Sequence, residues 1–142
     1  MIKELRLGNY VKTTISRWRG QGFPILAIKQ DAVSFDKLND GQYIWVMAEN
    51  LKPIPLSPEI LEKCGFKEYI EMGKGESGLW EHLKSLKSGY TFAWNYDKRV
   101  MIMHPGNSIS HWLDVKIEYL HQLQNLYFAL TGEELEVNLT VV

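Results

Sequence analysis

The sequence predicts an α+β fold: a mostly antiparallel sheet with a small SH3-like or barrel-like N-terminal half, one short helix and one long helix. Two observations lead to this prediction. Residues 1–56 contain short runs of β-branched and aromatic residues separated by turn residues, a pattern typical of antiparallel meanders and small barrels. Near the C-terminus, by contrast, apolar residues recur at helical spacing. We expect a single compact domain over residues 1–142, which divides, if at all, into a β-rich half (1–56) and an α+β half (57–142).

The N-terminal half is expected to contain four short strands, covering residues 9–15, 24–29, 32–35 and 43–47. The segment Gly20-Gln21-Gly22 precedes the second strand, and Asn39-Asp40-Gly41 precedes the fourth. Glycine, asparagine and aspartate accept the backbone conformations that tight turns require. These signals place the turns between the strands.

A short helix is expected next. Ser57 can cap its N-terminus, Pro58 suits the first helical position, and Glu59 is favourable in the first turn. Cys64-Gly65 should end it, because glycine is the common helix terminator. A strand is then expected over residues 66–72, whereas residues 79–87 fit either a short helix or a strand.

The clearest hairpin joins residues 90–96 to residues 99–104, with the turn at Asp97-Lys98. The best helix covers roughly residues 115–130, capped by Asp114 and ended by Thr131-Gly132. Its apolar stripe, expected to be buried, includes Leu120, Leu123, Leu126 and Leu130. Its polar band consists of His121, Gln122, Gln124 and Asn125 and is expected to be solvated. With the apolar Ile117 and Phe128 on the same side, it could instead be a contact between subunits. A last strand is expected over residues 136–142.

Composition excludes several classes of protein. With 45% hydrophobic residues the 142-residue chain is not disordered, and it is too short for a TIM barrel. No apolar stretch is long enough to span a membrane, and the N-terminal residues lack the apolar core of a secretory signal. Cys64 is the only cysteine, so an internal disulfide is impossible. We therefore expect a cytoplasmic protein that does not associate with membranes.

The net charge of −1 hides an asymmetry between the start of the chain and the rest. Residues 1–30 carry six basic side chains and one acidic side chain, Glu4. The basic ones are Lys3, Arg6, Lys12, Arg17, Arg19 and Lys29. Such a segment can be the electrostatic footprint of a nucleic-acid-binding protein. It can also complement the acidic remainder of the same chain or of a second copy, which is the interpretation we favour.

One glycine motif matches a nucleotide-binding pattern. Residues 73–78 read G-K-G-E-S-G, and Asp97 follows about twenty residues later. A dinucleotide site also requires a parallel βαβ core. Here the next segment is a hairpin, and only 64 residues follow the motif. We expect a loop that binds no nucleotide.

The sequence predicts no metal, cofactor or catalytic site. His82, His104, His111 and His121 lack the spacing of known zinc motifs. Cys64 directly precedes a helix-ending glycine, where a buried, inert thiol is the common case. No nucleophile is paired with a base in a recognisable motif.

Two groups of residues are candidates for a contact surface. Tyr90, Phe92, Trp94 and Tyr96 share one face of a strand, and they could stack on nucleic-acid bases. We favour a core role for them, since a chain of this size needs large apolar side chains. The candidate contact residues are Arg17, Trp18, Arg19, Lys98 and Arg99. The first three lie in a glycine-rich turn and the last two at the hairpin tip.

Three stretches of the chain resemble a known group of proteins. They are LRLGNYV (5–11), IPLSPEILEKCGF (54–66) and HQLQNLYFALTGEEL (121–135). Together they are similar to small uncharacterised proteins of Bacteroidetes phages, prophages and mobile elements. The resemblance implies an accessory role and assigns no activity, cofactor or site. We therefore expect a non-catalytic accessory or protein-interaction module, whose partner is a protein of the host, a protein of the phage or a second copy of this chain. The alternative is a nucleic-acid-binding protein that uses the basic N-terminal segment and the 90–104 hairpin.

Overall fold

The computed structural model describes residues 2–15, 22–70, 80–95, 97–104 and 110–139. The predicted α+β class is confirmed: the strands pair antiparallel, and the described residues form one short and one long α-helix. The chain divides into two compact units. The barrel unit consists of Met1–Pro55, Tyr119–Leu135 and Leu139–Val142, and the sheet unit consists of Leu56–Glu118 and Glu136–Asn138. Neither α-helix is long and apolar enough to cross a membrane, within the residues that are described.

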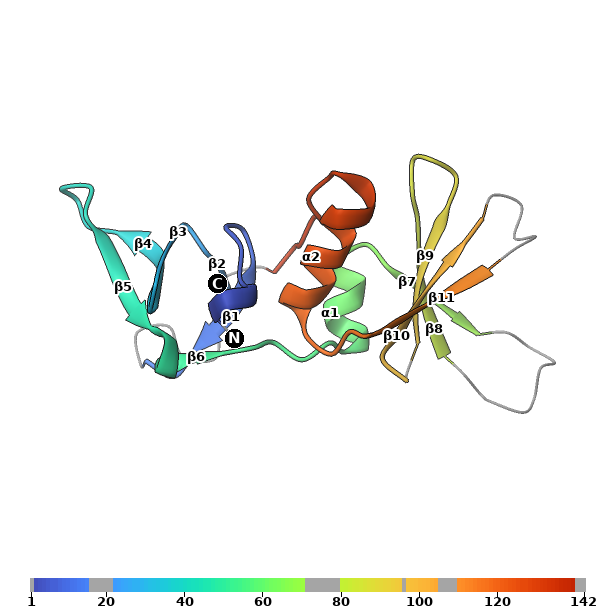
Figure 1. The fold of residues 1–142 in the computed structure, drawn as a ribbon, viewed down its shortest axis with the longest axis horizontal. Helices are drawn as coiled ribbons and strands as arrows, with labels where there is room; N and C mark the ends of the chain where they lie inside the picture. The colour runs from blue at the N-terminus through green and yellow to red at the C-terminus, as the bar shows by residue number, and fades with distance from the viewer. Residues whose placement is uncertain (1, 16–21, 71–79, 96, 105–109, 140–142) are drawn as a thin grey trace. The chain divides into compact units, whose positions relative to one another are not determined.

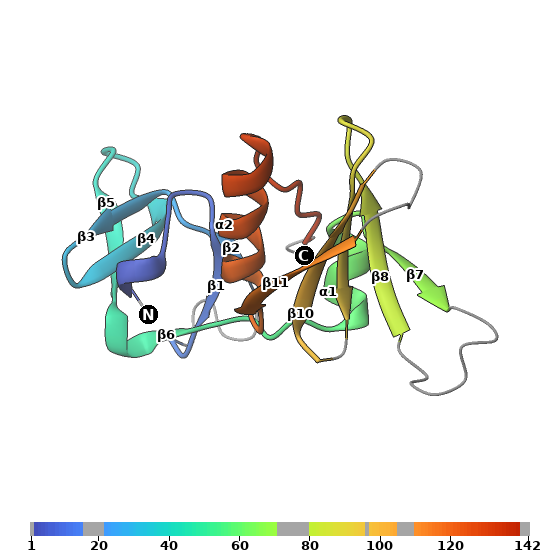
Figure 2. The ribbon, with the colours of Figure 1, turned by 45° about the vertical axis from the view of Figure 1, so that its right-hand side comes forward.

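The barrel unit contains two three-stranded sheets, ordered β2-β1-β6 and β3-β4-β5 (Figures 1 and 2). Its strands are β1 (Tyr10–Thr13), β2 (Phe23–Pro24), β3 (Ala27–Lys29), β4 (Ala32–Lys37), β5 (Tyr43–Met47) and β6 (Leu51–Lys52). A 3-10 helix, Ala48–Asn50, joins β5 to β6, and another covers Ile2–Glu4.

The strand expected over residues 24–29 is in fact two strands in different sheets. The backbone N–H of Ile25 donates to Asn9, whereas the N–H of Leu26 donates to Ser34 in the other sheet. The chain thus changes partner at this corner, and both sheets pack on one core. The buried side chains of that core are Leu5, Val11, Ile25, Val33, Phe35, Val46 and Leu51.

The long helix α2 (Leu120–Thr131) also belongs to the barrel unit. The prediction that it begins near residue 115 with Asp114 as cap was wrong. Residues up to Lys116 form a strand, and Tyr119 is the N-cap, its N–H donating to the side-chain Oε1 of Gln122. The C-terminal prediction is confirmed, because Gly132 adopts φ +72° as the cap.

The buried face of α2 differs from the predicted apolar stripe. Leu120 and Leu123 are fully buried, as expected, but Leu126 is half-buried and Leu130 is 46% exposed. The helix is turned so that His121 and Gln124 are buried in their place, which contradicts the expected solvated band. These polar side chains can be buried because they form hydrogen bonds, Gln124 with backbone groups and His121 with the carboxylate of Glu4.

The sheet unit contains a five-stranded antiparallel sheet in the order β11-β10-β9-β8-β7, together with the short helix α1 (Pro58–Lys63). Its strands are β7 (Lys67–Ile70), β8 (Trp80–Ser85), β9 (Thr91–Asn95), β10 (Arg99–Met103) and β11 (Ser110–Lys116). The predicted 90–104 hairpin is confirmed as β9 and β10. The ambiguous stretch 79–87 forms a strand, and β11 was not predicted. No strand forms over residues 136–139, where one was expected.

The short helix and the aromatic strand follow the predictions closely. The Ser57 hydroxyl accepts the N–H of Ile60 at 3.2 Å, and α1 ends at Cys64 before Gly65. Phe92 and Trp94 are buried, so the core interpretation is confirmed for these two. Tyr90 is half-buried, and Tyr96 lies outside the described residues.

Candidate binding surface

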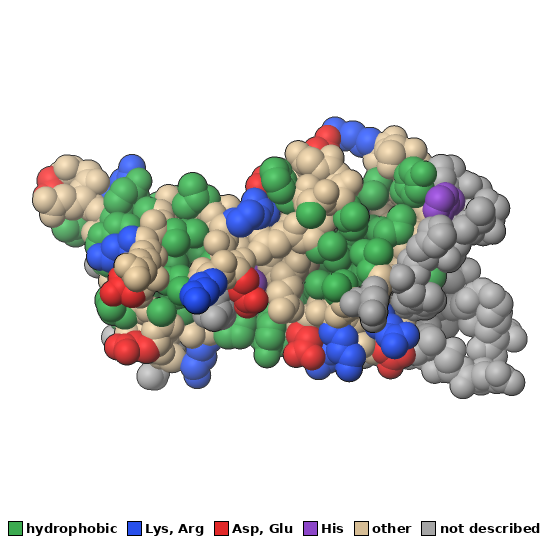
Figure 3. Space-filling model, in the orientation of Figure 1, with side chains coloured by type: hydrophobic (Ala, Val, Ile, Leu, Met, Phe, Trp, Pro, Cys, Tyr) green, Lys and Arg blue, Asp and Glu red, His purple; other side chains and the backbone are tan. Residues whose placement is uncertain are grey.

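Strand β5 presents a row of exposed apolar side chains at the end of the β3-β4-β5 sheet. Tyr43 and Trp45 are each 36% exposed and Met47 is 42% exposed, whereas Val46 between them is fully buried. Side chains alternate between the two faces of a strand, so these three residues share the outer face. We call Tyr43, Trp45 and Met47 the β5 row. In Figure 3, the visible face of the molecule likewise carries hydrophobic side chains among charged ones.

Two lysines lie against the β5 row. The Nζ atom of Lys29 is 4.5 Å from the centroid of the Trp45 ring, and the Nζ atom of Lys37 is 4.8 Å from that of Tyr43. The Tyr43 and Trp45 rings are themselves 5.7 Å apart. A cation over an aromatic face is attracted by the ring quadrupole. The surface therefore combines apolar area with positive charge.

Sequence reasoning found this strand but not the surface. The run Tyr43-Ile44-Trp45-Val46-Met47 is apolar at every position, so no polar alternation marks its outer face. One feature of the sequence did indicate the surface, because Tyr43 and Trp45 are two residues apart and so share one face of the strand. The sequence does not say which face is buried; the contacts of Ile44 and Val46 with the core decide that.

The predicted contact residues fall in two places. Arg17, Trp18 and Arg19 lie outside the described residues. Lys98 and Arg99 lie in the sheet unit at the turn between β9 and β10, where Lys98 has a φ of +63°. A residue with a side chain is strained in this left-handed region.

Lys98 and Arg99 help to line a depression of about 450 Å³ in the sheet unit. Its other lining residues are Asp97, Lys116 and Glu118. Arg99 is directly opposite Lys116 across the β10–β11 pair, and Lys98 is 3.7 Å from a carboxylate oxygen of Glu118. The depression thus mixes three cations with two carboxylates.

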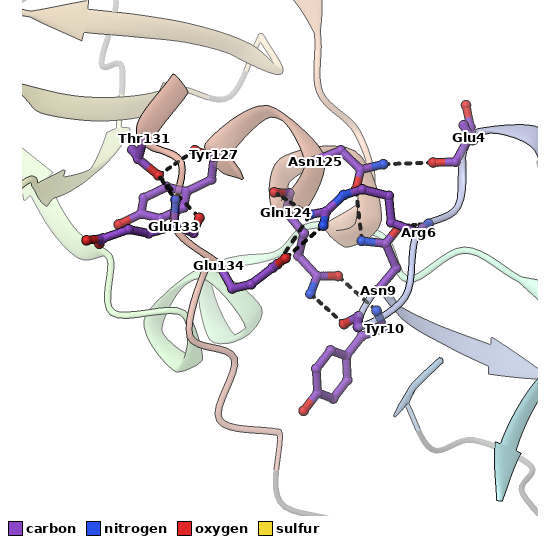
Figure 4. Close-up of polar contacts among 11 residues, drawn as sticks. Glu4, Arg6, Asn9, Tyr10, Gln124, Asn125, Tyr127, Thr131, Glu133 and Glu134 are labelled. Carbon is purple, nitrogen blue, oxygen red and sulfur yellow. Dashed lines mark hydrogen bonds and ion pairs between the residues drawn. The ribbon is translucent and has the colours of Figure 1, made fainter. Parts of the chain in front are cut away.

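The basic N-terminal segment is partly neutralised within the barrel unit. Arg6 donates from Nε to Asn125 Oδ1 at 2.8 Å and from Nη1 to Glu134 at 2.8 Å (Figure 4). Its guanidinium lies over the ring of Phe128. The prediction that Asn125 is merely solvated was therefore wrong. Its Nδ2 also donates to the carbonyl of Glu4. These contacts hold α2 against the N-terminal segment.

Two histidines, His82 and His121, are fully buried. His121 has its Nε2 atom 2.8 Å from a carboxylate oxygen of Glu4 and stacks on Tyr119. His82, on β8, has two ring nitrogens that find no hydrogen-bond partner among the described residues. No group of three or more metal-ligating side chains occurs in the part of the chain that is described. The G-x-G-x-x-G motif at 73–78 lies outside it.

The environment of Cys64 suppresses thiol chemistry. Burial raises the pKa of the thiol to about 11, although the nearby Lys84 ammonium acts in the opposite direction. Only a thiolate is a competent nucleophile. Cys64 is therefore protonated at neutral pH, in agreement with the expectation of an inert residue.

Comparison with known proteins adds no family. No protein-family model matches the chain, and no curated protein or solved structure matches it either.

Proposed function

We propose that this protein is a non-catalytic binding module that recognises another protein through the β5 row. The observation that carries the proposal is the exposure of Tyr43, Trp45 and Met47 on one face of an ordered strand. Aromatic residues and methionine are enriched at the centres of protein interfaces, where they provide most of the binding energy. Lys29 and Lys37 beside them add charge that can select the partner.

The chemistry of the other candidate sites supports a non-catalytic role. Cys64, the single thiol, is buried and protonated at neutral pH. His82 is sealed within the sheet unit, where its ring cannot reach a substrate. By contrast, the β5 row offers contact area without a nucleophile or a base. Such a surface can bind a partner but has no group that would catalyse a reaction on it.

The proposal includes a cytoplasmic location and an accessory role for a phage or mobile element. The single cysteine supports the location, because a protein that forms no internal disulfide is suited to a reducing compartment. The similarity of residues 5–11, 54–66 and 121–135 to small phage and prophage proteins supports the role.

The test is to select peptides from a random display library on the wild-type protein, with depletion on Trp45→Ala. Leu7→Ala is the matched control, because Leu7 is an exposed apolar residue outside the β5 row. We expect selected peptides to bind Trp45→Ala at least about tenfold more weakly, the effect of a hot-spot residue. They should bind Leu7→Ala as tightly as wild type. Failure to select any peptide, or equal affinity for Trp45→Ala, would contradict the proposal.

Nucleic-acid binding is the second candidate function, and one observation favours it. Arg99 and Lys116 are directly opposite one another, and like charges at such positions repel unless an anion joins them. Asp97 and Glu118 in the same depression oppose a polyanion.

Fluorescence anisotropy with a labelled single strand of roughly 20 nucleotides decides between the two functions. We expect no micromolar binding at physiological ionic strength. Micromolar binding that weakens with salt and is reduced by Arg99→Ala together with Lys116→Ala would establish the second function instead.

A further inference from the structure

The backbone N–H and C=O groups of the β5 row point away from β4, toward the outer edge of the sheet. Ala48 N–H donates to the carbonyl of Asp31 on the β4 side, and the carbonyl of Gln42 accepts the N–H of Leu38. The backbone groups of Gln42 and Ala48, the even-numbered residues on either side of the row, thus point toward β4. Backbone groups of successive strand residues alternate between the two neighbouring strands. The odd-numbered residues of the β5 row therefore direct their N–H and C=O groups to the outer edge.

This edge is unprotected in the described part of the chain. Strand β5 is an edge strand of the β3-β4-β5 sheet, and no described segment pairs with its outer side. Natural proteins usually guard such an edge with a charged residue, a proline or a bulge in the edge strand. Residues 43–47 contain none of these, and the bulge between Ser34 and Asp36 lies in β4. An ordered, uncharged edge of this kind is a template for another strand.

The charges beside the edge define the chemistry of that strand. On β3, β4 and β5 the charged side chains are Lys29, Asp36 and Lys37. Both lysines lie against the β5 row, whereas Asp36 is opposite Ile44, whose side chain is on the other face. If another strand paired with the outer edge of β5, every second side chain of that strand would lie on the same face as Lys29 and Lys37. The remaining side chains would extend the apolar layer of Ile44 and Val46.

We propose, resting on the function proposed above, that the partner is an extended segment with alternating acidic and apolar residues. It adds to the free edge of β5 as a fourth strand of the β3-β4-β5 sheet. Its backbone pairs with Tyr43, Trp45 and Met47, and its carboxylates meet Lys29 and Lys37. A second copy of this chain is a poorer occupant, since β5–β5 pairing would bring four lysines together on one face.

Met47 offers a direct test of the backbone contact. Its φ of −68° is the value that proline requires, and its N–H points to the free edge. Met47→Pro therefore removes one donor and leaves the strand conformation unchanged, as proline does at sheet edges. Met47→Ala is the matched control, because it removes the same side chain and keeps the donor.

The probe is a fluorescein-labelled peptide of four Glu-Val repeats, and its binding to the full chain is measured by anisotropy. We expect Met47→Pro to bind about three- to tenfold more weakly than Met47→Ala, the effect of one hydrogen bond. Lys29→Glu with Lys37→Glu should weaken binding by about tenfold or more, and a Lys-Val repeat peptide should not bind. Hydrogen exchange should slow at the amides of Tyr43, Trp45 and Met47 when the Glu-Val peptide is added.

The outcomes separate this inference from the proposed function. If no Glu-Val peptide binds while library peptides still require Trp45, the inference is wrong and the proposed function stands. Equal affinities of Met47→Pro and Met47→Ala would likewise reject strand addition. A wild-type dimer that Met47→Pro converts to a monomer would show that a second copy occupies the edge. If library peptides ignore Trp45 as well, both proposals fail.

Discussion

Gln124 on α2 accepts a hydrogen bond from the backbone N–H of Tyr10 on β1, at a distance of 2.8 Å. The same side chain donates from Nε2 to the carbonyl of Gly8 at 3.0 Å (Figure 4). Gln124 is almost completely buried. One amide thus satisfies two backbone groups of the barrel unit and fixes the helix on the strand.

We expect Gln124→Met to lower the free energy of unfolding by about 1–3 kcal/mol. The substitution keeps the side-chain volume and removes two hydrogen bonds, one from the Tyr10 N–H and one to the Gly8 carbonyl, each of which contributes about 0.5–1.5 kcal/mol. Urea unfolding monitored by circular dichroism measures the loss. Gln30→Met is the control, because Gln30 is exposed and should change stability by less than about 0.5 kcal/mol. Equal effects of the two substitutions would contradict this account.

Two leucines of α2 should respond very differently to truncation. Leu123 is fully buried, so Leu123→Ala should cost about 2–5 kcal/mol through lost burial and the cavity left behind. Leu130 is exposed, and Leu130→Ala should cost less than about 0.5 kcal/mol. Chemical denaturation of both variants compares them. A larger loss for Leu130→Ala would show that the buried face of the helix has been assigned incorrectly.

The raised pKa of Cys64 predicts a loss of stability at alkaline pH. The thiol has a pKa of about 11 in the folded chain, against 9.0 for an unperturbed thiol. Below pH 9 it is protonated in both states and stability is unaffected. Between pH 9 and pH 11 the unfolded chain loses this proton first, so the free energy of unfolding falls.

Thermal unfolding of wild type and Cys64→Ala across this pH range isolates the effect. Cys64→Ala should show a shallower alkaline decline, whatever its stability at neutral pH. Tyr127, whose pKa is raised by burial and by Glu133, contributes equally to both proteins. A native thiol that reacts with a disulfide reagent at pH 8 as fast as the denatured chain would contradict the assignment.

His82→Leu should leave stability unchanged or raise it by up to about 2 kcal/mol. Both ring nitrogens are buried and lack a hydrogen-bond partner within the part of the chain that the structure describes, and each such group carries a desolvation cost that an apolar side chain of similar size avoids. The free energy of unfolding from urea titration is the measurement. A loss of more than about 1 kcal/mol would mean that the imidazole makes a contact with residues beyond those described.

The sequence predicted best those elements whose stabilising contacts lie between residues close together in the chain. Ser57 and Pro58 specify the start of α1 because a cap needs only partners within one turn. The β9–β10 hairpin is likewise formed by neighbouring segments with a turn between them. By contrast, β11 was missed, because its ladder depends on hydrogen bonds to β10 that no local pattern reveals.

Local patterns in the sequence were therefore enough to predict the α+β class, the positions of α1 and the β9–β10 hairpin, and the burial of Cys64. Which face of an apolar segment is buried depends instead on packing between segments that are distant in the chain. Strand 43–47 is apolar on both faces, and Val46 rather than Trp45 is buried because Val46 meets the barrel core. On α2, Gln124 is buried and Leu130 is exposed, because the Tyr10 N–H and the Gly8 carbonyl lie where the amide of Gln124 can bond them. Burial follows the partners that the fold supplies, and those partners are distant in the sequence.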